Sequence, residues 1–351
     1  MNIRLLPLIL CLLLLPGHLV GQSRLLDENE RTPIPYAQLV DEDGVTVGWT
    51  DAEGVLPVVA VKGKITIQHL SYHSKTIPAV RLTREQPVLL SSKTYALREA
   101  GVTSARKDYI HLRTYFRSYQ LNDSCLKYYR DGFADFFIRL KNKKNKRYLT
   151  QVRTLVNRAL TDKDPRRAVM VVDKCMVLPY LEASTLVEQL KREGWTSRTD
   201  TASRSILQRD GWSAGVVVRE PDRGLCRVEY DGLEGKGAQE RSLFGYTMRI
   251  DTKRQTETYR YRKDYQSYMD LLDSKEYRKL FYSHKKDTRE QLIEVMDELY
   301  VLEHEYLSTD EMKERTSALG HGQLPIPYPD ASVVSPLNER LQEIMATMEP
   351  E

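Results

Sequence analysis

Alternation of apolar and polar residues over long stretches is the feature that most limits what this 351-residue chain can form. It is clearest in residues 109–121 and again in residues 134–140. Side chains with a period of two point to alternate faces of a strand, and one wet face is typical of an antiparallel sheet. A turn at 122–124, a charged loop at 141–146 and a strand at 147–155 complete a prediction of paired antiparallel strands.

Residues 23–100 have a different pattern. Short segments rich in Val, Ile and Thr alternate with Gly-containing turns at intervals of about 8–12 residues. Turns are predicted at Asp41 to Gly44 and Asp51 to Gly54. Strands are predicted at 36–40, 45–50, 58–61 and 65–70. This spacing predicts a small β-sandwich.

The same region resembles the carboxypeptidase regulatory-like domain, a transthyretin-like sandwich common at the start of exported proteins of Bacteroidetes-type bacteria. The matching residues are Pro33 to Ala37, Thr50-Asp51 with Gly54, and Ser71-Tyr72. The family usually has Gly-Tyr at the last of these places, and an aromatic residue where this chain has Val55. The resemblance implies a non-catalytic domain that positions the rest of the chain and acts as a spacer. The remaining chain resembles companion regions of that domain, which have no assigned activity.

Residues beyond 155 mix helices with further strands. Helices are predicted at 182–193, ended by Gly194, at 268–281, capped by Ser267, and at 336–348 after a Pro-rich stretch at 324–329. Strands are predicted at 168–172, 214–219, 225–230, 243–250 and 255–261, the last two joined by a turn at Asp251-Thr252-Lys253. Residues 288–307 fit a helix, while the run Leu299 to Leu302 also fits an edge strand.

These elements predict a chain that is mainly β with α. An N-terminal immunoglobulin- or transthyretin-like β-sandwich (23–100) is followed by an α+β domain (103–320) and by a Pro-rich tail with a short helix (321–351). The second domain should hold a large antiparallel sheet, for which a half-barrel around helices is one arrangement.

The first 22 residues predict a cleavable export signal. Arg4 supplies a positive start, Leu5 to Leu15 is apolar, Pro16-Gly17 breaks it, and small Gly21 offers a cleavage point. An apolar run of this length is short for a membrane-spanning helix, which needs roughly 20 residues. We therefore expect an exported protein, periplasmic or associated with an outer membrane, with no transmembrane helix after cleavage.

Composition predicts a folded chain with no role in nucleic-acid binding. Hydrophobic residues make up 41% and charged residues 29%, which supports a packed core. The net charge is only +4, with both signs interspersed. The mature chain keeps Cys125, Cys175 and Cys226, for which no pairing can be deduced and three buried, unpaired thiols are the expectation.

Gly211-Trp212-Ser213-Ala214-Gly215 is the sharpest motif, because it matches the nucleophile elbow of serine hydrolases. That elbow needs a buried strand before the Ser and a helix after it. Here the preceding residues are polar and Val216 to Val218 reads as a strand. We therefore expect a plain turn between antiparallel strands, with Ser213 kept as a weak catalytic candidate.

Other chemistries find weaker support. His69 and His73, placed in or beside one strand, would be too far apart to share a metal ion. Asp131 and Asp135 are the best pair for glycoside hydrolysis, but a solvated turn or strand edge is expected there. Gly232, Gly235 and Gly237 read as a flexible hairpin loop, not as a dinucleotide site. No metal site or cofactor is predicted.

The function predicted from the sequence is a non-catalytic envelope protein that binds a partner protein, a glycan or a lipid. The aromatic and basic stretches around residues 126–137 and 258–268 are ordinary strand composition or such a binding surface. Two alternatives stay open: a periplasmic hydrolase using Ser213, and a lipid or lipoprotein carrier. The carrier predicts a deep apolar cavity between the sheet and the helix expected at 268–281.

Overall fold

The structure is a computed structural model that describes residues 23–83, 86–95, 107–161, 174–234, 236–243, 245–263, 266–320 and 326–351. The expected export signal and the strand expected at 168–172 lie outside these residues.

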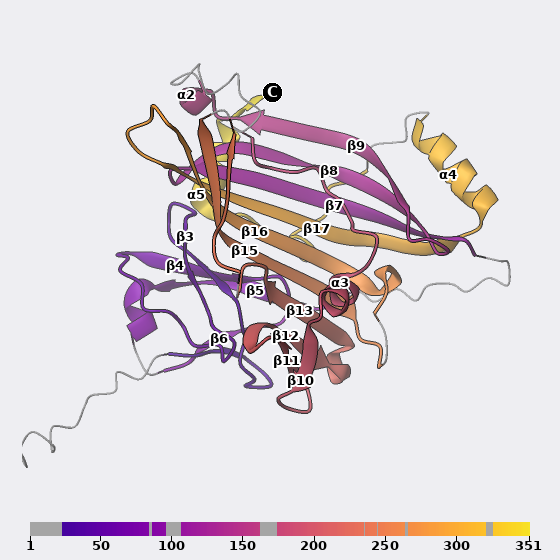
Figure 1. Ribbon diagram of the computed structural model, residues 1–351, viewed down its shortest axis with the longest axis horizontal. Helices are drawn as coiled ribbons and strands as arrows, with labels where there is room; N and C mark the ends of the chain where they lie inside the picture. Colours follow the sequence, from indigo (N-terminus) through magenta and orange to yellow (C-terminus); the bar gives the residue numbers. More distant parts are fainter. Residues whose placement is uncertain are drawn as a thin grey trace, which may run out of the picture.

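Twelve strands of the described chain form one large antiparallel sheet (Figure 1). Its order is β10-β11-β12-β13-β15-β16-β17-β7-β8-β9-β18, with β14 paired to β15. The strands are β7 (Tyr109–Asn122), β8 (Cys125–Arg139), β9 (Asn145–Val156), β10 (Thr196–Thr199), β11 (Arg204–Arg209), β12 (Trp212–Glu220), β13 (Leu225–Asp231), β14 (Gln239–Leu243), β15 (Tyr246–Arg260), β16 (Leu271–His284), β17 (Gln291–Leu307) and β18 (Glu349–Pro350).

The N-terminal unit is a smaller β structure. A four-stranded sheet, β3-β2-β4-β5, shares one apolar core with the parallel pair β1-β6, because Leu25, Leu39, Ile65 and Val88 all belong to a single buried cluster. The strands are β1 (Leu25–Asp27), β2 (Gln38–Val40), β3 (Thr46–Trp49), β4 (Lys64–His69), β5 (Tyr72–Pro78) and β6 (Val88–Leu90). The expected strand at 58–61 is absent from this described unit, where Val58 is exposed.

Helices are few and short in the described chain. They are α2 (Arg158–Thr161), α3 (Leu186–Arg192), α4 (Thr309–Gly320) and α5 (Glu339–Ala346), with 3-10 turns η1 (Ala79–Thr83), η2 (Pro221–Arg223) and η3 (Tyr268–Asp270). None of the helices described is both long and apolar enough to span a bilayer.

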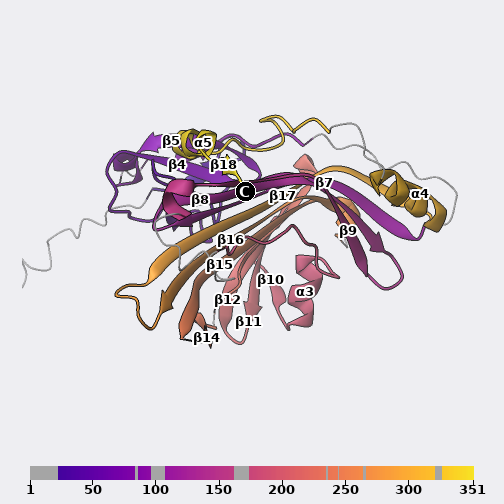
Figure 2. The same cartoon turned by 90° about the horizontal axis from the view of Figure 1, so that it is seen from above.

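The large sheet is bent into an arch, and its two faces have different neighbours (Figure 2). On the inner side lies α3, whose Leu186 and Leu190 join the largest apolar cluster with Phe136 and Val228. On the outer side lie the N-terminal unit and α5, whose Leu341 packs with Leu155. The fold class expected from the sequence, mainly β with a large antiparallel sheet and a smaller β unit, is confirmed.

The helix expected at 268–281 is wrong. Ser267 does cap a turn, but that turn is only η3, and the chain continues as β16 between β15 and β17. A central strand is covered on both faces, so its apolar residues lose the period of two and mimic helical spacing. Hydrogen bonds to β15 on one side and β17 on the other stabilise a strand more than the local sequence favours a helix.

Several other boundaries also differ from expectation. The turn at Asp251-Thr252-Lys253 is wrong, because β15 runs through it with a bulge between Ile250 and Thr252. The helix expected at 182–193 begins only at Leu186, where Thr185 forms a capping box with Glu188, and Gly194 ends it with φ +86° as predicted. The ambiguous stretch at 288–307 is β17.

Of the three described cysteines only Cys226 is buried, so the expectation of three buried thiols is wrong. Cys125 begins β8 and is exposed. Burial in an apolar cluster raises the pKa of the Cys226 thiol to about 11, and a thiol with so high a pKa is a poor nucleophile.

Candidate functional site

The Gly211 to Gly215 motif forms a tight hairpin between β11 and β12, as predicted. Asp210 and Gly211 occupy the turn with φ +51° and +83°, and Ser213 lies on β12, exposed. The Ser213 hydroxyl accepts a hydrogen bond from Gln208 (3.3 Å) on the neighbouring strand. The motif is therefore strand–turn–strand, whereas a nucleophile elbow requires strand–turn–helix.

His69 and His73 lie on opposite strands of the β4–β5 hairpin. His69 is buried, and its Nε2 donates to Glu229 (3.1 Å) while Nδ1 accepts from the Ser71 backbone (3.2 Å); His73 is exposed on β5. Because burial and the Arg227 charge lower the His69 pKa, the ring is neutral, as this pattern requires. Among the described residues, no three His, Cys, Asp or Glu side chains are placed to hold a metal ion.

Asp131 and Asp135 are not at a solvated turn or strand edge, and that expectation is wrong. Both are at most 1% exposed in the middle of β8. Asp131 accepts from Arg153 (2.6 Å), and Asp135 accepts from Arg113 (3.1 Å) and from His111 (2.7 Å). Neighbouring long strands surround them with donors, which single-sequence spacing cannot show. Each carboxylate is therefore held in a structural network.

The other sequence motifs also resolve into structure. Gly232 and Gly237 lie in the loop between β13 and β14, as expected, while Gly235 lies outside the described residues. Most aromatic residues of the two aromatic-rich stretches are buried: Tyr128, Tyr129, Phe133, Phe136, Phe137, Tyr259 and Tyr268. These aromatic residues belong to the hydrophobic core, so they do not form the binding surface that the two stretches had suggested.

A pocket of about 280 Å³ opens on the inner face of the arch. Its floor consists of two rows of side chains that cross the sheet, because residues directly opposite each other on paired strands share a face. One row runs Ser118, Asp297, Glu276, Gln255 and Tyr230 across β7, β17, β16, β15 and β13. The next row runs Phe116, Leu299, Ser274 and Glu257. All of these residues line the pocket.

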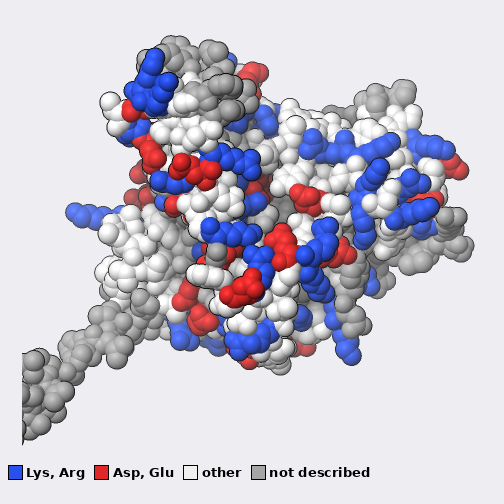
Figure 3. Space-filling model, in the orientation of Figure 1, with Lys and Arg blue, Asp and Glu red and all other residues white. Residues whose placement is uncertain are grey.

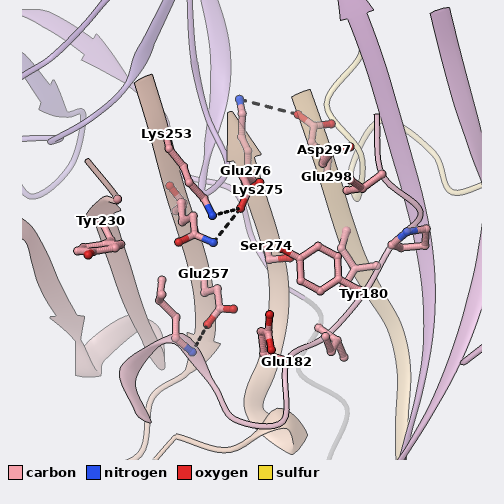
Figure 4. Close-up of a pocket in the computed structure, with 18 of the residues that line it drawn as sticks. Tyr180, Glu182, Tyr230, Lys253, Glu257, Ser274, Lys275, Glu276, Asp297 and Glu298 are labelled. Carbon is pink, nitrogen blue, oxygen red and sulfur yellow. Dashed lines mark hydrogen bonds and ion pairs between the residues drawn. The ribbon is translucent and has the colours of Figure 1, made fainter. Parts of the chain in front are cut away.

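Residues 177–193 form the roof of the pocket, and we refer to 177–185 as the strap (Figure 4). Tyr180 and Glu182 reach from the strap toward the floor residues Ser274 and Glu257. The Tyr268 hydroxyl holds the strap by donating to the carbonyls of Glu182 (3.0 Å) and Ser184 (2.8 Å).

Two further anchors fix the strap at its ends. On the β9 side, the Arg147 guanidinium donates to the Pro179 carbonyl and the Asn145 amide donates to the Leu181 carbonyl. At the start of α3, the Leu186 backbone N–H donates to Glu257 (3.0 Å). The roof is thus tied to β9, β15 and η3, which holds it in place above the floor.

Polar groups on the pocket floor are held in place by one another. Glu276 accepts from Gln255 (2.9 Å) and pairs with Lys253 (3.3 Å) and Arg278 (3.0 Å). Arg278 also donates to Asp297 (2.6 Å). Fixed partners of this kind lower the entropy that a ligand-binding group loses when it pairs with a ligand.

Burial raises the pKa of several groups around the pocket. Desolvation raises the pKa of Glu257 and of Asp297 above the usual carboxyl range, despite the hydrogen bonds that oppose it. Desolvation and the Glu276 charge raise the Tyr180 pKa to about 12, so its hydroxyl stays protonated as a donor. The pocket therefore offers both donors and acceptors, with more carboxyl groups than cations.

Sequence reasoning did not find this pocket. Its floor comes from five strands spread over residues 116–299. Its roof comes from residues 177–193, of which only 182–193 were assigned, as a helix. A usable signal was present: β15, β16 and β17 carry charged side chains on both faces, where a covered sheet should be apolar on at least one.

Comparison with known proteins gives no assignment. No protein family model matches the chain, and no curated protein matches it. A solved structure described as "Lipid-protein interactions in lipovitellin" is similar over 57% of this chain and 26% of that chain, at 6% identity and a TM-score of 0.23. A likeness that low carries no argument about fold or function, and the resemblance of residues 23–100 to the regulatory-like domain stays a prediction.

Proposed function

We propose that the protein is a non-catalytic binding protein that holds a glycan fragment in the pocket beneath the strap. The observation that carries the proposal is the pocket itself: a strapped cavity whose floor is built from fixed carboxylate, amide, hydroxyl and ammonium groups. A sugar hydroxyl both donates and accepts, so each of these groups can pair with it. The ring of Tyr180, 48% exposed, offers an apolar face beside them.

The lining distinguishes a glycan from a lipid. A lipid chain needs an apolar cavity. Packing an acyl chain against charged side chains would remove water from those charges, which costs free energy. Here Glu182, Glu257, Glu276 and Lys253 line the space, and the helix that would have bounded a lipid cavity is instead strand β16. The polar floor supports a hydroxylated ligand over an acyl chain.

A hydrolase at Ser213 has less support than binding. Ser213 is on the β11–β12 hairpin and is not among the pocket residues. The direct test is labelling of purified protein with a fluorophosphonate probe. We expect the probe to label the wild type no more than the Ser213→Ala variant. Labelling that depends on Ser213 would show an activated nucleophile and would replace the binding proposal.

Saturation-transfer NMR tests the glycan proposal. The purified chain from Ser23 onward is mixed in turn with neutral, amino and acidic mono- and disaccharides. We expect transfer to at least one of them, strongly reduced in Tyr180→Ala and in Glu276→Gln. Tyr180→Ala removes the aromatic ring from the roof. Glu276→Gln removes the negative charge of an acceptor and keeps the size of the side chain.

Matched controls are available in this chain. Tyr328 is 47% exposed, close to the exposure of Tyr180, but belongs to the C-terminal segment. Glu290, paired with Arg249 (3.2 Å), is a carboxylate away from the pocket. Tyr328→Ala and Glu290→Gln should leave transfer unchanged. Equal loss in control and pocket variants, or transfer from none of the sugars, would contradict the proposal.

Export is part of the proposal and rests on residues 1–22 alone. In a bacterial host with a secretory pathway, we expect the chain in the periplasmic fraction with an N-terminus at Gln22 or Ser23. Mass spectrometry of the intact protein measures this directly. A chain that keeps Met1 and stays in the cytosolic fraction would contradict export but would leave the pocket proposal standing.

A further inference from the structure

The turn that joins β8 to β9 carries a dense group of positive charges. Residues 139–147 contain six cations and no acid. The members of this group, which we call the cationic tip, are Arg139, Lys141, Lys143, Lys144, Lys146 and Arg147. The whole chain has a net charge of only +4, so this density is local and not a property of the composition.

Most of the cationic tip is exposed and unneutralised. Arg139, Lys141, Lys144 and Lys146 are exposed and make no ion pair with any residue that the structure describes. Lys143 lies 3.8 Å from Glu188. Figure 3 shows Lys and Arg side chains gathered over the end of the molecule that carries this turn and α4. Exposed charges of one sign within about 10 Å, the Debye length at 0.1 M salt, act together on a charged surface.

The tip is closed by main-chain hydrogen bonds and presents an apolar side chain. Two main-chain hydrogen bonds close the turn: Arg139 N–H donates to the Lys144 carbonyl and Lys143 N–H donates to the Arg139 carbonyl, both at 2.8 Å. Leu140 lies at this turn, is 37% exposed and is flanked by Arg139 and Lys141. An apolar side chain flanked by two cations suits an anionic bilayer surface, where the cations can pair with headgroups and the apolar group can enter the lipid.

We propose that the cationic tip docks the protein on an anionic lipid surface, with Leu140 entering the headgroup region. The side chains of the tip favour lipid over nucleic acid. Residues 139–147 include no aromatic side chain on which a base could stack, and the nearby Tyr148 is packed edge-on against Phe137 at 5.7 Å.

Vesicle co-sedimentation tests the proposal. The chain from Ser23 onward is mixed with vesicles of phosphatidylcholine, alone or with 30 mol% phosphatidylglycerol (roughly the anionic density at which polybasic segments bind). We expect sedimentation only with the anionic vesicles, and release at about 1 M salt, where the Debye length falls to about 3 Å. Binding that is equal on both vesicles, or absent on both, would overturn the proposal.

Variants locate the contact. In Lys141→Gln/Lys144→Gln/Lys146→Gln, the partition onto anionic vesicles should fall about 100-fold, at about five-fold for each Lys. The matched control removes the same charge elsewhere, at the exposed residues Lys62, Lys64 and Lys286. That triple Gln variant should bind within a few fold of the wild type, and an equal loss in both variants would reduce the effect to net charge and overturn the proposal.

Leu140→Ser separates a lipid surface from other polyanions. Binding to anionic vesicles should fall about tenfold, because an inserted Leu loses its transfer free energy. A fluorescent single-stranded DNA and a sulfated polysaccharide serve as rival ligands. Binding to either of them that depends on the three Lys and ignores Leu140, with no preference for anionic vesicles, would assign the tip to that polyanion and overturn the lipid proposal.

Discussion

At the scale of single residues, this sheet is unusual for the charges that it buries. Asp131 accepts from Arg153 (2.6 Å) and from the hydroxyls of Tyr129 (2.9 Å) and Tyr115 (3.2 Å), so three strands meet at one carboxylate. Burying a charge is tolerable only when its partners satisfy it, and removing one partner leaves the others unpaired.

Asp131→Asn should therefore lower the free energy of unfolding by about 2 kcal/mol. The amide keeps the volume but turns one acceptor into a donor that faces donors. The value is at the low end for a buried pair, because the Arg153 side chain is 47% exposed. Urea unfolding measures it, and Asp43→Asn, at an exposed turn position, is the control. Equal stability of both variants would show that the network contributes nothing.

Lys275 lies on the outer face with 10% of its side chain exposed, and its ammonium donates to Gln38 (2.9 Å) and lies 3.8 Å from Glu298. Burial lowers the Lys275 pKa to about 8, and the attraction of Glu298 does not offset it. A Lys whose pKa is lower in the folded chain binds its proton less tightly there. The folded state is therefore penalised below pH 8, and the penalty disappears as pH rises toward 10.5.

Relative to Lys275→Met, the wild type should thus gain roughly 3 kcal/mol of stability between pH 7 and pH 10.5. Tyrosine ionisation at high pH affects both proteins and cancels in the difference. Denaturant midpoints measured at several pH values give the curve. A difference that is flat with pH would mean that Lys275 keeps an ordinary pKa in the folded protein.

At the scale of elements, the β11–β12 hairpin explains why a catalytic-looking motif contains two glycines. Gly211 takes a positive φ in the turn, which an L-residue adopts only at a cost of about 1 kcal/mol. Gly215 has another reason: a Cβ there would lie 2.0 Å from the Glu229 carbonyl oxygen on β13. The motif is thus a requirement of strand pairing.

Gly215→Ala should destabilise the protein by about 3 kcal/mol or more, because β12 and β13 must separate to admit the methyl group. Gly211→Ala, where no atom lies within 4 Å of the new Cβ, should cost only about 1 kcal/mol. Thermal and urea unfolding of the pair measure the contrast. If the two variants were equally stable, the close approach of β12 to β13 would be wrong.

At the scale of the whole molecule, buried polar contacts join the N-terminal unit to the outer face of the arch. His69 donates to Glu229 (3.1 Å), Thr46 N–H donates to Glu294 (3.3 Å), and Trp49 packs on Tyr277 at 5.2 Å. Arg227 also donates to Glu229 (2.6 Å). Separating the two units would expose or orphan these groups, so we expect them to unfold together.

Glu229→Gln should test this coupling, with about 3 kcal/mol lost. Buried Arg227 would lose its nearest carboxylate and be left with Glu220, at 3.8 Å. Trp49 reports on the N-terminal unit and Trp195 on the inner face, so single-tryptophan versions follow each region by fluorescence. Both reporters should shift to the same lower urea midpoint, and the Glu290→Gln control should shift neither. Two separate transitions would show that the units fold independently.

The local pattern of the sequence was enough for much of the secondary structure. Alternation over 109–121 and 134–140 predicted β7 and β8, and Gly194 marked the end of α3, because these signals depend on near neighbours in the chain. Strand β16 was missed for a related reason. Its apolar spacing is set by what packs on its two faces, and its hydrogen-bonding partners β15 and β17 lie outside the local sequence signal.

The candidate site depends even more than the strands do on contacts between residues far apart in the sequence. Sequence by itself determined a mainly β chain and a hairpin at Ser213. Only the tertiary structure decided that Glu276, Asp297 and Gln255 share one face beneath Tyr180, and that Asp131 is buried. A pocket floor is assembled by register across strands, and register is set by which residues the whole sheet can bury, a quantity that no single segment contains.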